Sequence, residues 1–165
     1  LPARVAATYA FMFVLFGTLL YYAKGAEFFY DFAASISGGK AGGPAKVAVI
    51  TSAFFGSISG SSVANVVTTG SFTIPLMKRT GYRPHDAGAI EAIASTGGQF
   101  MPPVMGAGVF ILATLTETSY LTIALLNVIP ALVFFTFLLM MVDLEVIILM
   151  QVMVMTSFKA EMEMM

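Results

Sequence analysis

Long apolar runs, flanked or interrupted by clusters of small polar residues, dominate the pattern along the chain. Residues 5–23 and 120–142 are almost wholly apolar. Each run matches the roughly 20 residues that a helix needs to cross a bilayer. Two tyrosines and a lysine end the first run (Tyr21, Tyr22 and Lys24), which is typical of a membrane interface. Both runs are therefore predicted to be transmembrane helices.

Two shorter apolar runs, 45–55 and 63–77, flank the sequence Gly-Ser-Ile-Ser-Gly-Ser-Ser-Val-Ala-Asn at 56–65. Neither run spans a membrane comfortably alone, and each glycine costs roughly 1 kcal/mol in a helix interior. We therefore predict that the helix is broken over 56–65 and that the two runs form a re-entrant hairpin. One long kinked helix over 45–77 is the alternative.

A second break is predicted at 95–103, where the sequence reads Ser-Thr-Gly-Gly-Gln-Phe-Met-Pro-Pro. Its two prolines remove amide donors and hold a helix open, so helical segments are expected on either side, at 86–95 and 103–115. Unwound backbone at membrane depth must be buried in protein or line a cavity. Paired interrupted helices are typical of the ion and substrate site of a secondary transporter. A proline kink without a ligand is the alternative.

The remaining segments fit a membrane chain whose basic loops share one side. Residues 27–37 are too short to cross and carry aromatic residues beside two acids, which predicts an amphipathic helix in the interface. Five basic residues lie at the two mouths of the hairpin: Lys40, Lys46, Lys78, Arg79 and Arg83. The positive-inside rule places both mouths in the cytoplasm. The methionine-rich tail, 143–165, is assigned no function.

Composition narrows the class of protein. The chain is 58% hydrophobic and 10% charged, whereas a soluble domain is about a quarter charged, so a bilayer is the expected solvent. A net charge of −1 gives no reason to expect nucleic acid as a partner, and the absence of cysteine excludes disulfides. No nucleophile–base pair is evident, so an enzyme is not expected. The start at Leu1 indicates a fragment without a signal peptide.

The first break carries neutral oxygen atoms and no carboxylate. They come from Ser59, Ser61, Ser62 and Asn65, while Gly60 lets the backbone turn. Such a set suits Na⁺ better than Ca²⁺ or Mg²⁺. The helix that follows directs its first amides toward the same turn, which favours a substrate carboxylate. The alternative is that glycine and serine only let helices pack closely.

The second break adds four candidates, which offer a hydroxyl, free carbonyls and an amide: Thr96, Gly97, Gly98 and Gln99. Glu91, the only ionisable residue between 87 and 116, lies about two turns earlier. Acids within a membrane usually face a partner or a cavity. We expect a structural or pairing role for Glu91, with proton binding and shaping of the site as alternatives.

Five segments then follow one another in a recognisable order: 43–48, 56–65, 70–79, 91–99 and 102–106. In this order they resemble the large membrane subunit of tripartite ATP-independent periplasmic (TRAP) transporters, above all the fused permeases of the TAXI branch. The resemblance covers roughly residues 2–143. It assigns residues 1–142 to a permease segment and leaves 143–165 as a divergent tail.

The resemblance implies an all-α membrane protein with the elevator-type fold of the ion transporter superfamily. That fold contains two inverted repeats, each with a re-entrant hairpin and a discontinuous helix. The chain resembles one repeat, so the remaining half of the permease is an implied partner. The implied function is Na⁺-coupled uptake of small organic acids across the bacterial inner membrane, with substrate delivered by a periplasmic binding protein.

Carried onto this sequence, the resemblance implies that the hairpin tip and the second break form one Na⁺ site, made of Ser59, Gly60, Ser61, Ser62, Asn65, Thr96, Gly97 and Gly98. Ser62, Asn65 and Gln99 would approach the substrate. No organic cofactor is expected. Two alternative functions remain: a Na⁺/carboxylate symporter that needs no binding protein, and a non-transporting membrane scaffold.

Overall fold

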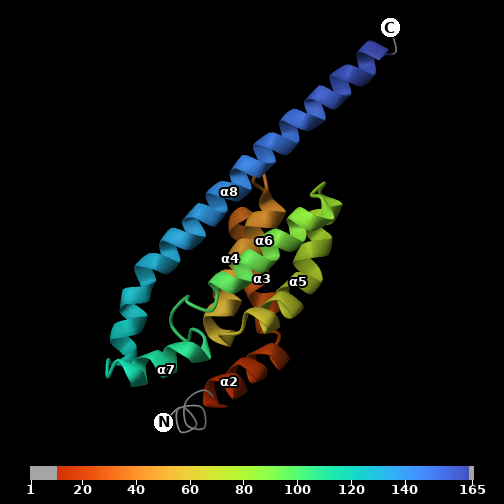
Figure 1. The fold of residues 1–165 in the computed structure, drawn as a ribbon. Helices are drawn as coiled ribbons and strands as arrows, with labels where there is room; N and C mark the ends of the chain where they lie inside the picture. The colour runs from red at the N-terminus through yellow and green to blue at the C-terminus, as the bar shows by residue number, and fades with distance from the viewer. Residues whose placement is uncertain (1–10, 164–165) are drawn as a thin grey trace.

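The computed structural model describes residues 11–163, and this part of the chain is helical without any strand. The helices are α2 (Phe11–Tyr22), α3 (Gly25–Ser37), α4 (Gly43–Ser59), α5 (Ser62–Arg79), α6 (Pro84–Gly97), α7 (Ala107–Leu115) and α8 (Tyr120–Glu163). Helices α3 to α6 form a bundle, and α8 runs along it and continues beyond it (Figure 1). The prediction of an all-α chain is confirmed.

Helices α4 and α5 pack against each other as an antiparallel pair joined by Gly60 and Ser61 alone. Gly60 ends α4 in the left-handed region, with φ of 62°, and its amide donates to the Gly56 carbonyl. The Ser61 hydroxyl caps α5 by accepting from the Ala64 amide at 3.3 Å. A helical hairpin is therefore present, instead of one kinked helix. Its re-entry into a membrane stays a prediction.

The predicted extent of the first break is wrong. Helix α4 continues through Gly56 to Ser59, and Asn65 already lies in the first turn of α5. Helix α5 also passes through Gly70 and Pro75 without interruption. Only two residues uncoil, because Gly56 lets α4 pack closely against residue 98, where a Cβ atom on Gly56 would lie 2.6 Å from the Gly98 Cα, and this tertiary contact offsets the local cost of a glycine in the helix.

The second break separates α6 from α7 and covers residues 98–106. Its predicted start is early, since α6 continues to Gly97, and α7 begins at Ala107 instead of 103. Residues 102 and 103 have no amide hydrogen, and they are joined by a cis peptide bond. The next amide, of Val104, donates away from the helix axis to the Ser57 carbonyl at 3.0 Å. Regular helical hydrogen bonding therefore resumes only after Gly106.

Helix α3 packs along α4 and not as an isolated helix. The Phe29 ring stacks on Phe54 with 5.8 Å between the ring centroids, while Phe28 and Ile36 stay exposed. The predicted helix at 27–37 is thus confirmed, and its location in the membrane interface stays a prediction. The first part of the predicted span 5–23 lies outside the described residues, which begin at 11 within α2.

Within the described chain, one helix is long and apolar enough to cross a membrane, over Tyr120–Val152 of α8. Helix α8 crosses the predicted boundary at 142/143 without a break. Its buried side chains, Phe135, Leu138 and Val142, join a core with Val49 of α4 and Ile90 of α6. This contact fixes the middle of α8 against the hairpin and α6.

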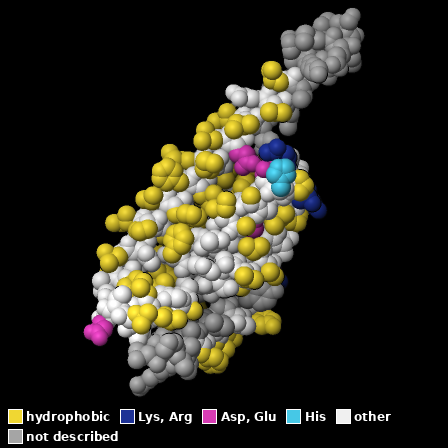
Figure 2. All heavy atoms as spheres, viewed as in Figure 1, with side chains coloured by type: hydrophobic (Ala, Val, Ile, Leu, Met, Phe, Trp, Pro, Cys, Tyr) yellow, Lys and Arg dark blue, Asp and Glu magenta, His cyan; other side chains and the backbone are white. Residues whose placement is uncertain are grey.

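The two mouths of the hairpin lie together at the end of the bundle that is opposite the tip. Lys46 of α4 forms an ion pair with Asp143 of α8, and Arg83, before α6, pairs with Asp86 at 2.5 Å. In Figure 2 most of the visible charged side chains gather where α8 leaves the bundle, whereas hydrophobic side chains spread over the rest of that face. Both mouths therefore share one side, as the basic residues predict, and the assignment of that side to the cytoplasm stays a prediction.

Candidate functional site

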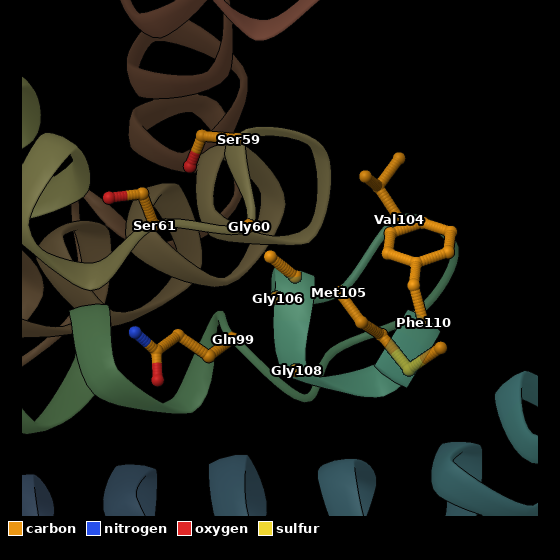
Figure 3. A pocket seen from close by; sticks show the side chains of 10 residues that line it. Ser59, Gly60, Ser61, Gln99, Val104, Met105, Gly106, Gly108 and Phe110 are labelled. Carbon is orange, nitrogen blue, oxygen red and sulfur yellow. The ribbon is translucent and has the colours of Figure 1, made fainter. Parts of the chain in front are cut away.

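A cavity of about 330 Å³ lies between the hairpin tip and the second break (Figure 3). The tip contributes Ser59, Gly60 and Ser61. The opposite wall consists of Gln99, residues 104–108 and Phe110. The structure thus brings the two predicted breaks together, although they are separated by more than thirty residues in the sequence. Four of the predicted site residues line this cavity: Ser59, Gly60, Ser61 and Gln99.

The two breaks contact each other through one side-chain hydrogen bond and a close backbone approach. The Gln99 side chain crosses from one break to the other, where its Nε2 donates to the Ser62 hydroxyl at 2.9 Å. A Cβ atom at Gly60 would lie 2.1 Å from the Met105 carbonyl oxygen. With its positive φ and this close neighbour, position 60 accepts only glycine. The hairpin tip therefore packs closely against the second break, and the cavity lies beside this contact.

Polar groups at the tip have capacity left for a ligand. The Ser59 hydroxyl is buried and bonds to no other group of the described chain. At the start of α5, the Ser61 hydroxyl and carbonyl take the amides of Ala64 and Asn65. The amides of Ser62 and Val63 bond to no carbonyl or side chain in the described residues. The Ser59 hydroxyl, whose oxygen can bind a cation, therefore lies near the free amides of a helix N-terminus.

The other predicted site residues lie outside the cavity. Asn65 is fully buried between α4 and α5, where its Nδ2 donates to the Ser52 carbonyl at 2.9 Å. The exposed Thr96 donates its hydroxyl to the Ala92 carbonyl of its own helix at 2.7 Å. Both side chains already have partners in this arrangement, so neither is free to face the cavity.

Gly97 and Gly98 allow close packing between helices. A Cβ atom at Gly97 would lie 2.4 Å from the Phe134 ring of α8. A Cβ atom at Gly98 would lie 2.6 Å from the Gly56 Cα of α4. These contacts hold α6 between α4 and α8 at the level where the second break begins.

A second polar cluster, which the sequence analysis does not predict, surrounds Glu91. We call it the Glu91 cluster: the carboxyl group and the hydroxyls of Ser52, Thr69, Thr73 and Ser95. The hydroxyl oxygens lie 3.0, 2.5, 2.6 and 3.2 Å from the carboxyl oxygens, in that order. All five residues are fully buried. They come from α4, α5 and α6 and join these three helices.

The Glu91 carboxyl group has no cationic partner among the described residues, in which no Lys, Arg or His nitrogen lies within 4.0 Å of it. In the described chain, Glu91 is therefore hydrogen-bonded to hydroxyl groups and not paired with a basic residue. One signal in the sequence points this way. Thr69 and Thr73 share a face of α5, as Glu91 and Ser95 share a face of α6, because each pair is four residues apart.

A tyrosine at the start of α8 supports the far wall of the cavity. The Tyr120 hydroxyl lies against the carbonyl oxygens of Pro103, at 2.9 Å, and Val104. The Tyr120 ring stacks on Phe110 of α7 with 4.6 Å between the ring centroids. Helix α8 thereby contacts the backbone of the second break directly.

Comparison with known proteins places this geometry in a family. The profile of the family described as "Tripartite ATP-independent periplasmic transporter, DctM component" matches residues 2–162. No solved structure matches the chain significantly.

Three relatives are similar over part of the chain. The C4-dicarboxylate TRAP transporter large permease protein DctM of Pseudomonas aeruginosa is 36% identical over 120 residues, 73% of this chain and 28% of that protein. The isethionate TRAP transporter permease protein DctMQ of Oleidesulfovibrio alaskensis is 44% identical over 62 residues, 38% of this chain and 10% of the relative. A putative TRAP transporter large permease protein of Haemophilus influenzae is 29% identical over 91 residues, 55% of this chain and 21% of that protein.

The chain thus spans between a tenth and three tenths of the length of these relatives. The family profile, in contrast, covers nearly all of the chain, including both breaks and the Glu91 cluster. The family consists of transporter permeases and not of enzymes. From the match over residues 2–162, the chain belongs to the DctM component family of TRAP transporters, as part of a large permease subunit.

Proposed function

We propose that this chain forms part of a permease that couples Na⁺ entry to the uptake of a small organic acid across the bacterial inner membrane. The cavity between the hairpin tip and the second break holds the ion and the acidic group of the substrate. One observation supports this most directly. Ser59, whose buried hydroxyl has no partner, lines an open space of about 330 Å³, and the residues with free amides at the start of α5, Ser62 and Val63, follow directly after the cavity-lining Ser61.

The chemistry of the lining favours Na⁺ as the cation. Hydroxyl, backbone carbonyl and side-chain amide oxygens are hard ligands, and no carboxylate lines the cavity. A neutral set of this kind favours a weakly held monovalent ion. The Ser59 hydroxyl and the carbonyls around Gly60 are the ligands nearest the tip.

The start of α5 favours an anionic substrate. Its first amides carry the partial positive charge of a helix N-terminus, and a carboxylate or sulfonate group complements it. The names of two relatives agree with this chemistry, because C4-dicarboxylates and isethionate are both small organic acids. Gln99, already bonded to Ser62, is placed to contact the same group.

The proposed partners follow from the family and from the length of the chain. A tripartite periplasmic transporter includes a periplasmic binding protein, which would deliver the substrate. The rest of the permease, including the second repeat that the family resemblance implies, would supply the rest of the site, because the matched part of the chain covers 28% of the length of the P. aeruginosa relative. In an elevator mechanism the hairpin and α6 would move together as one body.

The test is uptake by the intact transporter as a function of Na⁺ concentration. In Ser59→Ala the ion loses one ligand worth about 1.5 kcal/mol, which raises the half-saturating Na⁺ concentration about tenfold. The matched control is Ser35→Ala on α3, an exposed serine whose hydroxyl bonds to its own helix. Unchanged Na⁺ dependence in Ser59→Ala would contradict the site.

Two further measurements separate the alternatives. Omitting the binding protein from a reconstituted assay abolishes uptake in our proposal, and leaves it intact in a direct Na⁺/carboxylate symporter. A membrane scaffold shows no Na⁺-dependent uptake in any variant.

A further inference from the structure

The face of α8 that packs on the rest of the chain is apolar over 120–142 except at two positions. The residues of this segment that are not exposed share one side of the helix: 120, 123, 124, 127, 131, 134, 135, 138, 139 and 142. Tyr120 and Asn127 are the two polar side chains among them, and both contact residues 103–105 of the second break. An apolar helix face therefore places its two polar groups at one short segment of unwound backbone.

Tyr120 binds two consecutive carbonyl groups of this segment. Its hydroxyl lies against the carbonyl oxygens of Pro103, at 2.9 Å, and of Val104. A phenol hydroxyl has one hydrogen, which the two oxygens share. Tyr120 is not among the residues that line the cavity, so these two carbonyl groups are held on the α8 side of the break.

Asn127 holds the next residue through its side chain. Asn127 Nδ2 donates to Met105 Sδ at 3.3 Å, and the Met105 side chain is fully buried. Figure 3 shows this side chain running away from Ser59 and Gly60 of the tip. Met105 also has a φ of 59°, in the left-handed region that residues other than glycine rarely adopt. Such a conformation persists only where the surrounding structure holds it, and the buried, bonded side chain does so here.

The Met105 carbonyl lies against the hairpin tip and not against α8. Its oxygen occupies the space that a Cβ atom on Gly60 would need. Within the described chain this oxygen accepts no hydrogen bond, whereas the carbonyls of Pro103 and Val104 have Tyr120 as their donor. Met105 and Gly60 both line the cavity. The segment thus presents one unbonded carbonyl at the tip and two bonded carbonyls at α8.

We propose that Tyr120 and Asn127 are positioning residues, which fix the second break so that the Met105 carbonyl faces the tip and remains free for the cation. Neither residue touches the ion itself. A binding site keeps its affinity only while such supporting contacts hold its ligands within about 0.5 Å of their positions. The inference rests on the proposed function, because it assigns this carbonyl to the cation of that site.

Tyr120→Phe tests the hydroxyl alone. The Tyr120 ring stacks on Phe110 with 4.6 Å between the ring centroids, and phenylalanine retains this contact, so α7 and α8 stay packed. In uptake by the intact, reconstituted transporter we expect the half-saturating Na⁺ concentration to rise about fivefold, as for the loss of one hydrogen bond. Maximal uptake at saturating Na⁺ should stay within about twofold of the wild type, because the variant weakens binding and not the transport step.

Tyr30→Phe on α3 is the matched control. The Tyr30 ring makes an edge contact with Phe72 of α5, with 5.1 Å between the ring centroids, and phenylalanine retains it. Helix α3 packs on α2, α4 and α5, so the same substitution there leaves the second break untouched. We expect neither the half-saturating Na⁺ concentration nor maximal uptake to change.

Asn127 is tested through its bond to sulfur. Asn127→Leu removes the donor at similar volume, and we expect the half-saturating Na⁺ concentration to rise about threefold. Met105→Leu removes the sulfur, so adding Asn127→Leu to this variant should cause no further rise, because residues that act through one contact are not additive. Equal rises with and without the sulfur would overturn the role of Asn127.

The response of Ser59→Ala separates this inference from the proposed function. If Ser59→Ala shifts the Na⁺ dependence and Tyr120→Phe does not, the inference is overturned and the proposed site stands. A fall in maximal uptake of Tyr120→Phe at an unchanged half-saturating Na⁺ concentration would also overturn it, because the tyrosine then supports only the fold. If neither variant shifts the Na⁺ dependence, the proposed cation site is contradicted and the inference falls with it.

Discussion

The cavity at the hairpin tip and the Glu91 cluster use the same residue types and differ in what is left unbonded. At the tip, the Ser59 hydroxyl has no partner and the first amides of α5 are free. Around Glu91, every hydroxyl lies within hydrogen-bonding distance of the carboxyl group, and no side chain is exposed. Serine and threonine within a helix bond to their neighbours, whereas at a helix end they leave groups for a ligand. The same residue types therefore form a closed polar core in one place and leave unbonded groups beside a cavity in the other.

The largest expected effect comes from the glycine contact that separates these two regions. In Gly56→Ala the new methyl group would lie 2.6 Å from the Gly98 Cα and 2.8 Å from Asn65 Nδ2. Because backbone atoms cannot move aside, α4 must shift away from α6, at a cost of about 2–3 kcal/mol. Thermal unfolding of the purified transporter measures this loss, which affects the cavity and the Glu91 cluster together.

Gly88→Ala on α6 is the matched control for this change. A Cβ atom there has no neighbour within 4 Å, and alanine is favoured over glycine in a helix by about 0.5–1 kcal/mol. We expect the unfolding midpoint to rise slightly. Equal midpoints for the two variants would show that the Gly56–Gly98 contact is not required.

An intermediate effect distinguishes two serines that lie two turns apart on α4. Ser52→Ala removes a donor to Glu91 Oε1 within a fully buried cluster, and we expect a loss of about 1–2 kcal/mol. Ser59→Ala removes a hydroxyl that has no partner, so the change stays within about 0.5 kcal/mol. Thermal unfolding in Na⁺-free buffer compares them, and a larger loss for Ser59→Ala would reverse our contrast.

The smallest effect is expected at the charged end of the bundle. Lys46→Met removes the ion pair with Asp143, whose side chain is 52% exposed. Ion pairs of this kind contribute below about 1 kcal/mol, and salt screens what remains. The unfolding midpoints of the variant and the wild type should converge as the salt concentration rises. A difference that is independent of salt would indicate a packing role for the lysine stem.

Much of the fold is predictable from the sequence because glycine, proline and apolar length set the helix boundaries. The hairpin turn at Gly60 and the opening after Gly97 both follow from such residues. The extent of the first break is not predictable in this way. Gly56 stays helical because its missing side chain lets α6 approach, and this tertiary contact offsets the local cost of a glycine.

The site is predictable where the sequence itself places polar residues at a helix end, as for Ser59, Ser61 and Gln99. Asn65 lies outside the cavity, because its amide bonds to a carbonyl of the opposite helix. The environment of Glu91 depends on Ser52, 39 residues away. Neither spacing nor composition predicts such a contact, because it arises only when α4, α5 and α6 pack together.

The contact of Tyr120 with the second break has a mechanical consequence. Helix α8 contains 44 residues and is therefore roughly 66 Å long. Helix α8 packs on Gly97 through the Phe134 ring, and the hydroxyl of its first residue, Tyr120, donates to a carbonyl beside the cavity. If α8 moves as a rigid helix that turns about this contact, a displacement of its C-terminal end also displaces Tyr120 and the cavity wall that Tyr120 contacts.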